Sequence, residues 1–421
     1  MESINIGSSI KVDVLPVGFS AKDVVEKYQK EGKESYYGVD LGAVVQKHEQ
    51  WKTHLPRVAP FYAVKCNDDP ILVRLLAGLG VGFDCASKIE IKTVLGLGVS
   101  PSRIVYANPC KFKSHLEYAE KEGCSLMTFD NKLELDKVKK IYPGARLLLR
   151  IRADDPDAIC QLGVKFGADP ANAPSLLQRA KDLDLNVVGV SFHVGSGCQN
   201  ATAFSDAVAA AAKVFTVGEE LGYQFNILDI GGGFPGTDSV KISFEEIAGE
   251  LNRSLDEHFP ESCDVSIIAE PGRFYASACA TLAVTVSSIR EVEQPDGNSS
   301  YMYYVSDGVY GSFNCILFDH AEVFPKIAFR DTEDVDARTC SIWGPTCDSM
   351  DVILKETKLP PLEIGDVLYF EDMGAYTKSS SSTFNGYSTP DCYYYVDNSS
   401  KEAVSNVLSP GSPLQLVVNV S

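Results

Sequence analysis

Eight short apolar segments recur between residues 61 and 270, and each ends where polar residues or glycines begin. Stretches with helical spacing follow the first seven segments, near 70–79, 88–96, 113–122, 132–140, 173–183, 203–220 and 244–257. The predicted strands are Phe61–Lys65, Gly82–Ala86, Ile104–Asn108, Leu126–Asp130, Arg146–Ile151, Val187–Val194, Ile227–Ile230 and Ser266–Glu270. Buried strands that alternate with helices in this number predict a (β/α)8 TIM barrel. A doubly wound open sheet is the alternative that the pattern alone allows.

The pattern changes after Gly272, where the helical spacing stops. Strand-like segments then dominate: Ala280–Val286, Tyr301–Val305, Val367–Glu371 and Cys392–Val396. They predict a C-terminal all-β domain. Before the barrel pattern, Ala21–Tyr28 has helical spacing and Tyr36–Val39 is a short strand candidate.

Composition narrows the class of protein. The 421 residues suffice for two domains, and a net charge of -19 argues against nucleic acid or a membrane surface as partner. The twelve cysteines form no CxxC pair, which indicates reduced thiols in a cytoplasmic protein. No signal peptide or membrane-spanning run is evident, and the six histidines show no metal-binding spacing, so no metal is expected.

Polar residues at the ends of the predicted strands carry the candidate chemistry. In a barrel these ends meet at one mouth, and they hold Lys65, Asp84, Arg150, His193, the glycines Gly231, Gly232 and Gly233, and Glu270. A lysine that ends a buried strand suits nucleophilic amine chemistry, since desolvation favours the neutral amine. Each residue alone also fits a structural role: Lys65 a surface lysine, His193 an interior residue, Glu270 an ion pair with Arg273.

Seven motifs in this order resemble the ornithine decarboxylase family of pyridoxal-phosphate enzymes, which has an alanine-racemase-like fold. They are Phe61–Lys65, Gly82–Ser87, Ser191–Gly197, Asp229–Phe234, Ala269–Arg273, Trp343–Asp348 and Glu371–Tyr376. The resemblance runs from about residue 35 to about 395. Together with the pattern, it implies a barrel at 35–276 and a β domain at 277–396, into which residues 1–34 pack. The polar residues 397–421 are expected to form a flexible tail.

The resemblance implies a site for pyridoxal 5'-phosphate at the barrel mouth. Lys65 would bind the cofactor covalently, and His193 would stack on its ring. Glu270, at a turn fixed by Pro271 and Gly272, would keep the pyridine nitrogen protonated. The cofactor phosphate would be bound by Ser196, Gly231, Gly232, Gly233, Arg273 and Tyr376. Asp84, Glu90 and Arg150 would hold Lys65 and the ring in place by charge, although all three also fit plain ion pairs.

The β domain would complete the site. In the family, the cysteine at the position of Cys347 returns a proton to the substrate carbon after decarboxylation. Asp319 and Asp348, with Phe318 beside them, match the residues that bind the distal amine of the substrate. Paired carboxylates suit a cationic chain end, and two short acids favour a three-methylene diamino acid over a guanidino one.

The activity implied is decarboxylation of L-ornithine to putrescine and carbon dioxide, the first committed step of polyamine biosynthesis. Two alternatives stay open: an antizyme-binding relative without activity, and a decarboxylase of lysine, arginine or diaminopimelate. Antizyme is a possible partner. The resemblance also implies a homodimer with shared active sites, in which Lys165 and Asp351 form an ion pair between subunits, although each alone fits a solvated surface charge.

Overall fold

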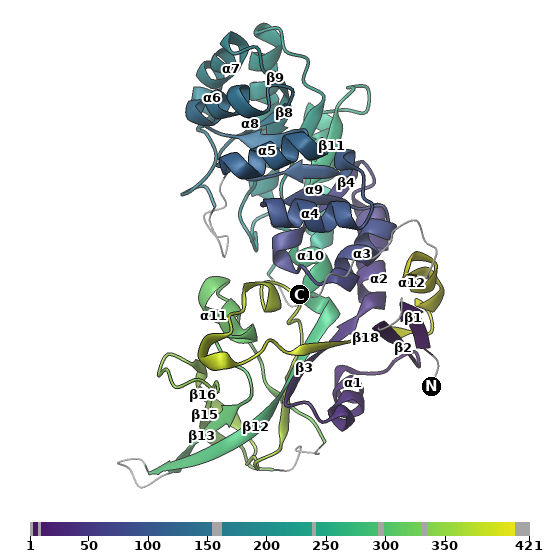
Figure 1. Ribbon diagram of the computed structural model, residues 1–421, viewed down its shortest axis with the longest axis vertical. Coiled ribbons are helices and arrows are strands. Elements are labelled where there is room, and N and C mark those ends of the chain that lie inside the picture. The colour runs from purple at the N-terminus through teal and green to yellow at the C-terminus, as the bar shows by residue number, and fades with distance from the viewer. Residues whose placement is uncertain are drawn as a thin grey trace. The chain divides into compact units, whose positions relative to one another are not determined.

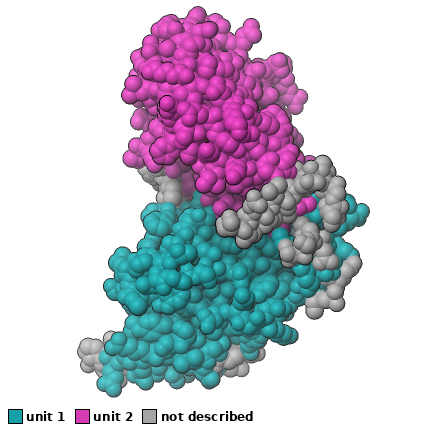
Figure 2. Space-filling view, viewed as in Figure 1, with its two compact units in different colours: residues 1–45, 276–409 teal, residues 46–275, 410–421 magenta. Residues whose placement is uncertain are grey.

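The computed structural model describes residues 3–6, 10–153, 162–237, 241–293, 299–329 and 335–408. These residues divide into two compact units, which are shown as a ribbon in Figure 1 and in two colours in Figure 2. Unit 1 takes in the described residues of Met1–Val45 and Ala276–Ser409, and unit 2 those of Gln46–Tyr275. The chain passes between them within helix α2 (Leu41–His54) and at the short helix α10 (Arg273–Ala276).

Unit 2 is a closed barrel in which all eight strands that the structure describes run parallel, so the predicted (β/α)8 fold is confirmed. In order around the barrel they are β4 (Val58–Ala63), β5 (Gly82–Cys85), β6 (Ile104–Tyr106), β7 (Leu126–Phe129), β8 (Arg146–Arg150), β9 (Asn186–Ser191), β10 (Ile227–Asp229) and β11 (Ser266–Ala269). Strand β11 pairs with β4, which closes the sheet. The open-sheet alternative is therefore wrong.

Helices follow the strands and surround the barrel (Figure 1). They are α3 (Pro70–Gly78), α4 (Lys88–Gly96), α5 (Lys113–Glu122), α6 (Lys132–Ile141), α7 (Ala173–Asp182), α8 (Thr202–Glu220) and α9 (Phe244–His258). Local capping explains their starts: Asp69 accepts the N–H groups of Ile71 and Leu72 in α3, and Ser87 accepts that of Glu90 in α4. None of the helices within the described ranges is both long and apolar enough to cross a membrane.

Inward-facing apolar residues from six strands fill the barrel: Val105, Leu126, Leu148, Val188, Ile227 and Ile268. The barrel is therefore a packed core, and its polar side chains are confined to the strand ends. All eight strands end one to three residues before the predicted carboxyl ends. Strand β4 ends at Ala63, so Lys65 lies in the 3₁₀ turn η2 (Val64–Cys66) just beyond it, and β9 ends at Ser191, before His193.

Unit 1 is built on a sheet that has ten strands within the described residues. Eight of them form the order β1 (Ser3–Ile6), β2 (Ile10–Leu15), β18 (Asp391–Asp397), β3 (Ser35–Asp40), β12 (Ala280–Glu293), β13 (Ser299–Val305), β15 (Arg338–Trp343) and β16 (Val352–Leu359). Strand β17 (Val367–Phe370) pairs with both β12 and β14 (Lys326–Ile327). The sequence prediction missed β14, β15 and β16, which are short or half-polar.

Three strands from the start of the chain, β1, β2 and β3, belong to this sheet. Strand β3 pairs with β12 and β18, and β2 pairs with β18. Helix α1 (Ala21–Tyr28) covers the sheet with Val24, Val25 and Tyr28, which are buried against Tyr36 and Tyr395. Residues 401–408, in the stretch expected to be a flexible tail, form helix α12 (Lys401–Leu408). The remainder of that stretch, from 409, lies outside the described residues.

Candidate active site

Lys65 and Asp84 form an ion pair at the carboxyl ends of two neighbouring strands. Asp84 lies in β5 opposite Ala63 of β4, and Lys65 follows two residues after Ala63. The Asp84 side chain is fully buried, whereas the Lys65 side chain is 42% exposed. A buried carboxylate needs a cation beside it, so Asp84 fixes the amine at the barrel mouth.

Glu90 adds a second carboxyl group near this pair. It lies in the first turn of α4, and its Oε2 accepts the backbone N–H of Ala86 at 2.6 Å. Burial raises the pKa of Glu90 to about 6, and the negative charge of Asp84 adds to this shift. The predicted grouping of Lys65, Asp84 and Glu90 is thus present in the structure.

Arg150 and His193 come from the next part of the barrel. Arg150 ends β8, is 9% exposed, and has its guanidinium carbon 5.5 Å from the centre of the Phe166 ring. His193 follows β9, and its Nδ1 accepts the N–H of Gly195 at 3.0 Å, which places the proton of a neutral ring on Nε2. Burial, followed by the charge of Arg150, lowers the pKa of His193 well below its usual range. The imidazole is therefore neutral at pH 7.

The glycine run after β10 packs tightly against the loop after β9. A Cβ atom on Gly231 would lie 2.2 Å from the carbonyl oxygen of Phe192, and one on Gly233 would lie 2.6 Å from that of Gly195. Both glycines also have positive φ angles, 62° and 115°, so other residues would be strained there. Such a backbone can approach a phosphate group closely.

Arg273 and Ser196 lie together beside these loops. Nε and Nη2 of Arg273 both donate to the Ser196 hydroxyl oxygen, at 3.1 and 2.7 Å. Within the described residues Glu270 forms no ion pair with Arg273, so that alternative is not found; the Glu270 carboxyl contacts the carboxyl of Asp229 instead. A guanidinium and a hydroxyl in contact form a suitable pair of donors for a phosphate.

Glu270 follows β11 and lies beside Asp229, which ends the neighbouring strand β10. Burial, and then the charge of Asp229, raise the pKa of Glu270 well above its usual range. Burial also raises the pKa of Asp229 to about 7, although its Oδ1 accepts the N–H of Gly231 at 2.9 Å. Asp229 was not assigned a role from the sequence. Its signal was an acid at the end of an apolar strand, two residues before the glycine run.

The residues of unit 2 fit pyridoxal phosphate. Glu270 Oε1 is buried and accepts no N–H or hydroxyl of the described residues, although the Glu270 carboxyl contacts that of Asp229, so a protonated pyridine nitrogen would satisfy it. Pro271 and Gly272 form the turn between Glu270 and Arg273, and a Cβ atom on Gly272 would lie 2.9 Å from Cβ of Cys66, next to Lys65. The structure thus brings an amine, a carboxyl group and hydrogen-bond donors for a phosphate to one end of the barrel. Among the residues that it describes, no acidic, Cys and His cluster could hold a metal ion.

The predicted residues of unit 1 lie on loops. Cys347 and Asp348 fall between β15 and β16; the Cys347 side chain is exposed, and its N–H donates to Oδ1 of Asn385 at 3.0 Å. Asp348 Oδ2 accepts the Tyr310 hydroxyl at 2.5 Å, and this hydrogen bond lowers the pKa of Asp348. Asp348 is therefore a fixed, ionised carboxylate.

Two further predicted positions follow short elements. Helix α11 (Cys315–Phe318) ends at Phe318, which is 71% exposed, and the next residue, Asp319, is 8% exposed. Tyr376, after β17, is half-buried and has a φ of 54°, which is rare for a tyrosine and indicates a constrained loop. The burial of Asp319 and the constrained backbone of Tyr376 both fix these residues in place, as a binding role requires.

Asp351 has partners inside its own unit. It is 1% exposed, and its two carboxylate oxygens accept the N–H groups of Val309 at 2.8 Å and Thr346 at 2.9 Å. This carboxylate therefore fixes the loop that carries Cys347 and Asp348, a role that was not predicted. Its ion pair with Lys165 of a second copy stays a prediction.

Comparison with known proteins gives consistent matches. The family described as pyridoxal-dependent decarboxylase, pyridoxal binding domain, matches residues 41–277. The chain is 48% identical to ornithine decarboxylase of Rattus norvegicus, over 95% of this chain and 90% of that protein. It is 49% identical to antizyme inhibitor 2 of Xenopus laevis, over 92% and 88%. The crystal structure of the Paramecium bursaria Chlorella virus arginine decarboxylase bound to agmatine is similar, with a TM-score of 0.84, 38% identity, and coverage of 89% of this chain and 100% of that one.

Proposed function

The chain belongs to the pyridoxal-dependent decarboxylases, and from this premise we propose that it converts L-ornithine to putrescine and carbon dioxide. The observation that carries the proposal is the pair of buried carboxyl groups of Glu270 and Asp229 at the same barrel end as Lys65 and Asp84. Two buried acids side by side are costly, and a protonated ring nitrogen would offset that cost. Similarity to the rat ornithine decarboxylase supports the choice of substrate.

When bound, pyridoxal phosphate supplies an aldehyde that joins amines and a ring that withdraws electrons from the substrate carbon. Lys65 would hold it covalently, and Asp84 would take up the proton that the Lys65 amine must lose. Glu270 would hold a proton at the ring nitrogen. The neutral imidazole of His193 could lie against the ring without adding positive charge, because its pKa is low.

The phosphate would be bound where Arg273 and Ser196 meet beside the glycine run. Tyr376 would contribute a hydroxyl to the same group. Arg150, buried near the two acids Asp229 and Glu270, would balance part of their negative charge.

The loops of unit 1 would act on the substrate. Asp348 and Asp319 would bind the distal ammonium group, with Phe318 packing on the methylene chain. Cys347, whose thiol is exposed, would donate the proton that replaces the carboxyl group. This assignment divides the work, so that unit 2 holds the cofactor and unit 1 supplies the substrate-binding residues.

We further propose a homodimer in which the Cys347 loop of one subunit completes the barrel mouth of the other. The order of this loop supports the proposal. Asp351 fixes the loop backbone, and Tyr310 fixes the side chain of Asp348, so the loop can present its residues to a partner. A two-fold axis would then create two equivalent sites.

The second candidate function is an antizyme-binding relative without activity, which the similarity to antizyme inhibitor 2 favours. Against it stands the presence of every residue that the cofactor and substrate need, including Lys65, Cys347 and Asp348. Activity on arginine or lysine is a third candidate, because the similar viral structure is an arginine decarboxylase.

One experiment separates these functions. The purified protein would be incubated with pyridoxal phosphate, and release of carbon dioxide from ornithine, lysine and arginine would be compared at equal concentration. We expect a visible cofactor absorption band and clear preference for ornithine. A protein that binds cofactor but prefers arginine or lysine contradicts the substrate, and one without band or turnover supports the regulatory alternative.

A further inference from the structure

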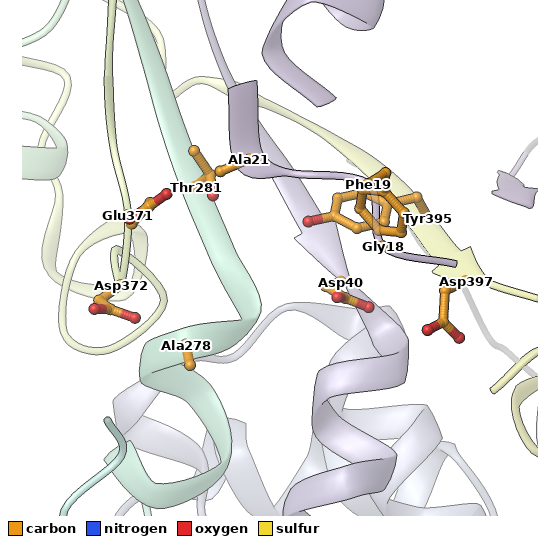
Figure 3. Close-up of a pocket in the computed structure, with 10 residues that line it drawn as sticks. All are labelled: Gly18, Phe19, Ala21, Asp40, Ala278, Thr281, Glu371, Asp372, Tyr395 and Asp397. Carbon is orange, nitrogen blue, oxygen red and sulfur yellow. The ribbon is translucent and has the colours of Figure 1, made fainter. Parts of the chain in front are cut away.

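Unit 1 contains a second candidate binding site, a pocket of about 290 Å³ (Figure 3). Of the ten described residues that line it, four are acidic and none is basic. The acidic residues are Asp40, Glu371, Asp372 and Asp397. None of the ten has a role in the proposed active site. The volume is near the lower end of the range of small-molecule sites, about 300–1,000 Å³.

Two of the carboxylates, those of Asp40 and Asp397, are held in place by hydrogen bonds from neighbouring residues. Asp40 Oδ1 accepts the N–H groups of Gly42 and Ala43 at 2.8 and 3.2 Å. Asp397 Oδ1 accepts the Ser399 hydroxyl and the Ser400 N–H, both at 2.8 Å. Asp397 also has contacts with the Ser400 hydroxyl and the Ser399 backbone, whereas Asp40 Oδ2 accepts no hydrogen bond from any residue that the structure describes. The Asp40 oxygen is therefore fixed in place and available to a ligand.

The hydroxyl groups of two buried residues give independent evidence for a ligand. Tyr395 is only 5% exposed and Thr281 only 6%, yet neither hydroxyl has a hydrogen-bond partner among the described residues. In Figure 3 the Tyr395 hydroxyl points into the space between Thr281 and Asp40. Both residues are more than nine-tenths buried while their hydroxyl oxygens stay accessible from the pocket, so a ligand atom or water is expected to bind them there.

The pocket is also short of positive charge. Burial raises the pKa of Asp40 to about 6, against the effect of its two backbone hydrogen bonds, and the charge of Asp397 raises it further. Burial, followed by the charge of Asp40, raises the pKa of Tyr395, to which Glu371 also contributes. Lys326 forms an ion pair with Glu371 and its charge also acts on Asp372, so the repulsion is concentrated at Asp40 and Asp397. A bound cation would relieve this repulsion.

The arrangement fits an organic cation better than a metal ion. Within the described residues, no three acidic, Cys or His side chains lie close enough to hold a metal. The acids are instead spread around an aromatic wall, in which Phe19 meets Tyr395 edge-on with ring centres 5.0 Å apart. Ammonium groups can bind the separate acids and hydroxyls, while methylene groups pack on the rings.

We propose that this pocket binds a linear aliphatic oligoamine with two or more ammonium groups. The inference deepens the proposed function and rests on it for the natural ligand, since putrescine, the proposed product, belongs to this class. Binding itself requires only the pocket. The site would let the protein respond to the amines that its own reaction supplies.

The test is calorimetric titration of the holoenzyme with spermidine, at about 0.15 M salt to screen weak surface attraction. Glu371→Gln combined with Asp397→Asn removes two charges, and the Asn side chain retains an oxygen for the Ser399 and Ser400 hydrogen bonds. We expect affinity to fall about 100-fold or more, since two charge-assisted hydrogen bonds are lost and each is worth roughly tenfold or more. Tyr395→Phe should give a smaller loss. Glu356→Gln, at an exposed position of β16, is the control and should bind as the wild type does.

Binding at the proposed active site is separated by the variant Asp348→Asn. If the pocket is the site, spermidine binding persists in Asp348→Asn and is lost in the double variant, which keeps ornithine turnover and its melting temperature. Equal affinity of wild type and double variant overturns the proposal, as does binding that only Asp348→Asn removes. Turnover is measured separately, so an inactive protein that binds spermidine in this pocket contradicts the proposed function alone.

Discussion

Asp229 ends β10 and Glu270 follows β11, so two buried carboxyl groups lie at the ends of neighbouring parallel strands. The pKa of each is raised, that of Glu270 by burial and then by Asp229, and that of Asp229 by burial to about 7. The cofactor-free protein therefore binds protons here that the unfolded chain releases at lower pH. A protonated ring nitrogen beside Glu270 would reverse this preference.

The first prediction concerns the pH dependence of stability without cofactor. Acids with raised folded-state pKa values stabilise the protein below their unfolded values, and this contribution is lost as the pH rises through the folded values. For Asp229 the loss extends from its ordinary value of 3.8 to about 7. We expect Asp229→Asn to flatten the fall in unfolding free energy across this window, measured by urea denaturation at several pH values.

Glu257→Gln provides the control for that measurement, because Glu257 is an exposed residue of α9 in the same unit. It should keep the wild-type slope in this window. If the slope is unchanged in Asp229→Asn, the pKa of Asp229 is not raised in the folded protein and the proposed interaction between the two carboxyl groups is wrong.

The second prediction tests the amine at the barrel mouth. Lys65→Ala should remove the covalent bond to pyridoxal phosphate and lower turnover by several orders of magnitude, since no other amine replaces the nucleophile. The measurement is the visible absorption band and its fixation to protein by borohydride. Lys92→Ala, at an exposed position of α4, should retain both. A reducible protein–cofactor bond that survives in Lys65→Ala would place the attachment at another lysine.

The third prediction concerns substrate binding. Asp348→Ala should lower kcat/KM for ornithine by roughly 10- to 150-fold, as expected when one charge-assisted hydrogen bond of about 1.5–3 kcal/mol is lost. The cofactor band should be unchanged. Tyr310→Phe, which removes the hydrogen bond that positions Asp348, should show a smaller loss of the same kind. Asp391→Asn, at an exposed residue of β18, is the matched control, and wild-type kinetics in Asp348→Ala would exclude Asp348 from the substrate site.

The sequence predicted the barrel well because its strands are buried on both faces and its helices have local start signals. Ser87 and Asp69 cap α4 and α3 as the residue types suggest, and α1 has the predicted bounds. Strands β15 and β16 were missed because half of each faces solvent and β16 carries Lys355, Glu356 and Lys358. Their pairing depends on partners distant in the sequence, which local pattern does not reveal.

The sequence predicted which residues form the candidate site, but it did not predict which of their charged groups are buried or how their pKa values shift. Asp229 is one more polar strand end until the barrel places it beside Glu270. Asp351 resembles a surface acid in the sequence, yet the loop folds around it and buries it to 1% exposure. Burial of a charged group follows from tertiary packing, so its pKa and its role follow from the structure alone.

The last prediction tests whether active sites are shared between two subunits. Lys65 belongs to unit 2, whereas Cys347 belongs to unit 1, on the loop that Asp351 organises. Lys65→Ala and Cys347→Ala should each be inactive alone. If the two variants exchange subunits, a mixed dimer has one site with both defects and one with none. Random pairing makes half of the dimers mixed, so roughly a quarter of the wild-type activity should return.

Subunit exchange must be shown independently, for example by mass spectrometry of differently tagged chains. A mixture of Lys65→Ala with Lys65→Ala carrying the second tag is the control and should stay inactive, because all its sites have the same defect. Recovered activity in the first mixture requires that Lys65 and Cys347 of one site come from different chains. Exchange without recovery would mean that each chain supplies both residues to its own site, and the proposed projection of the Cys347 loop into a partner would be wrong.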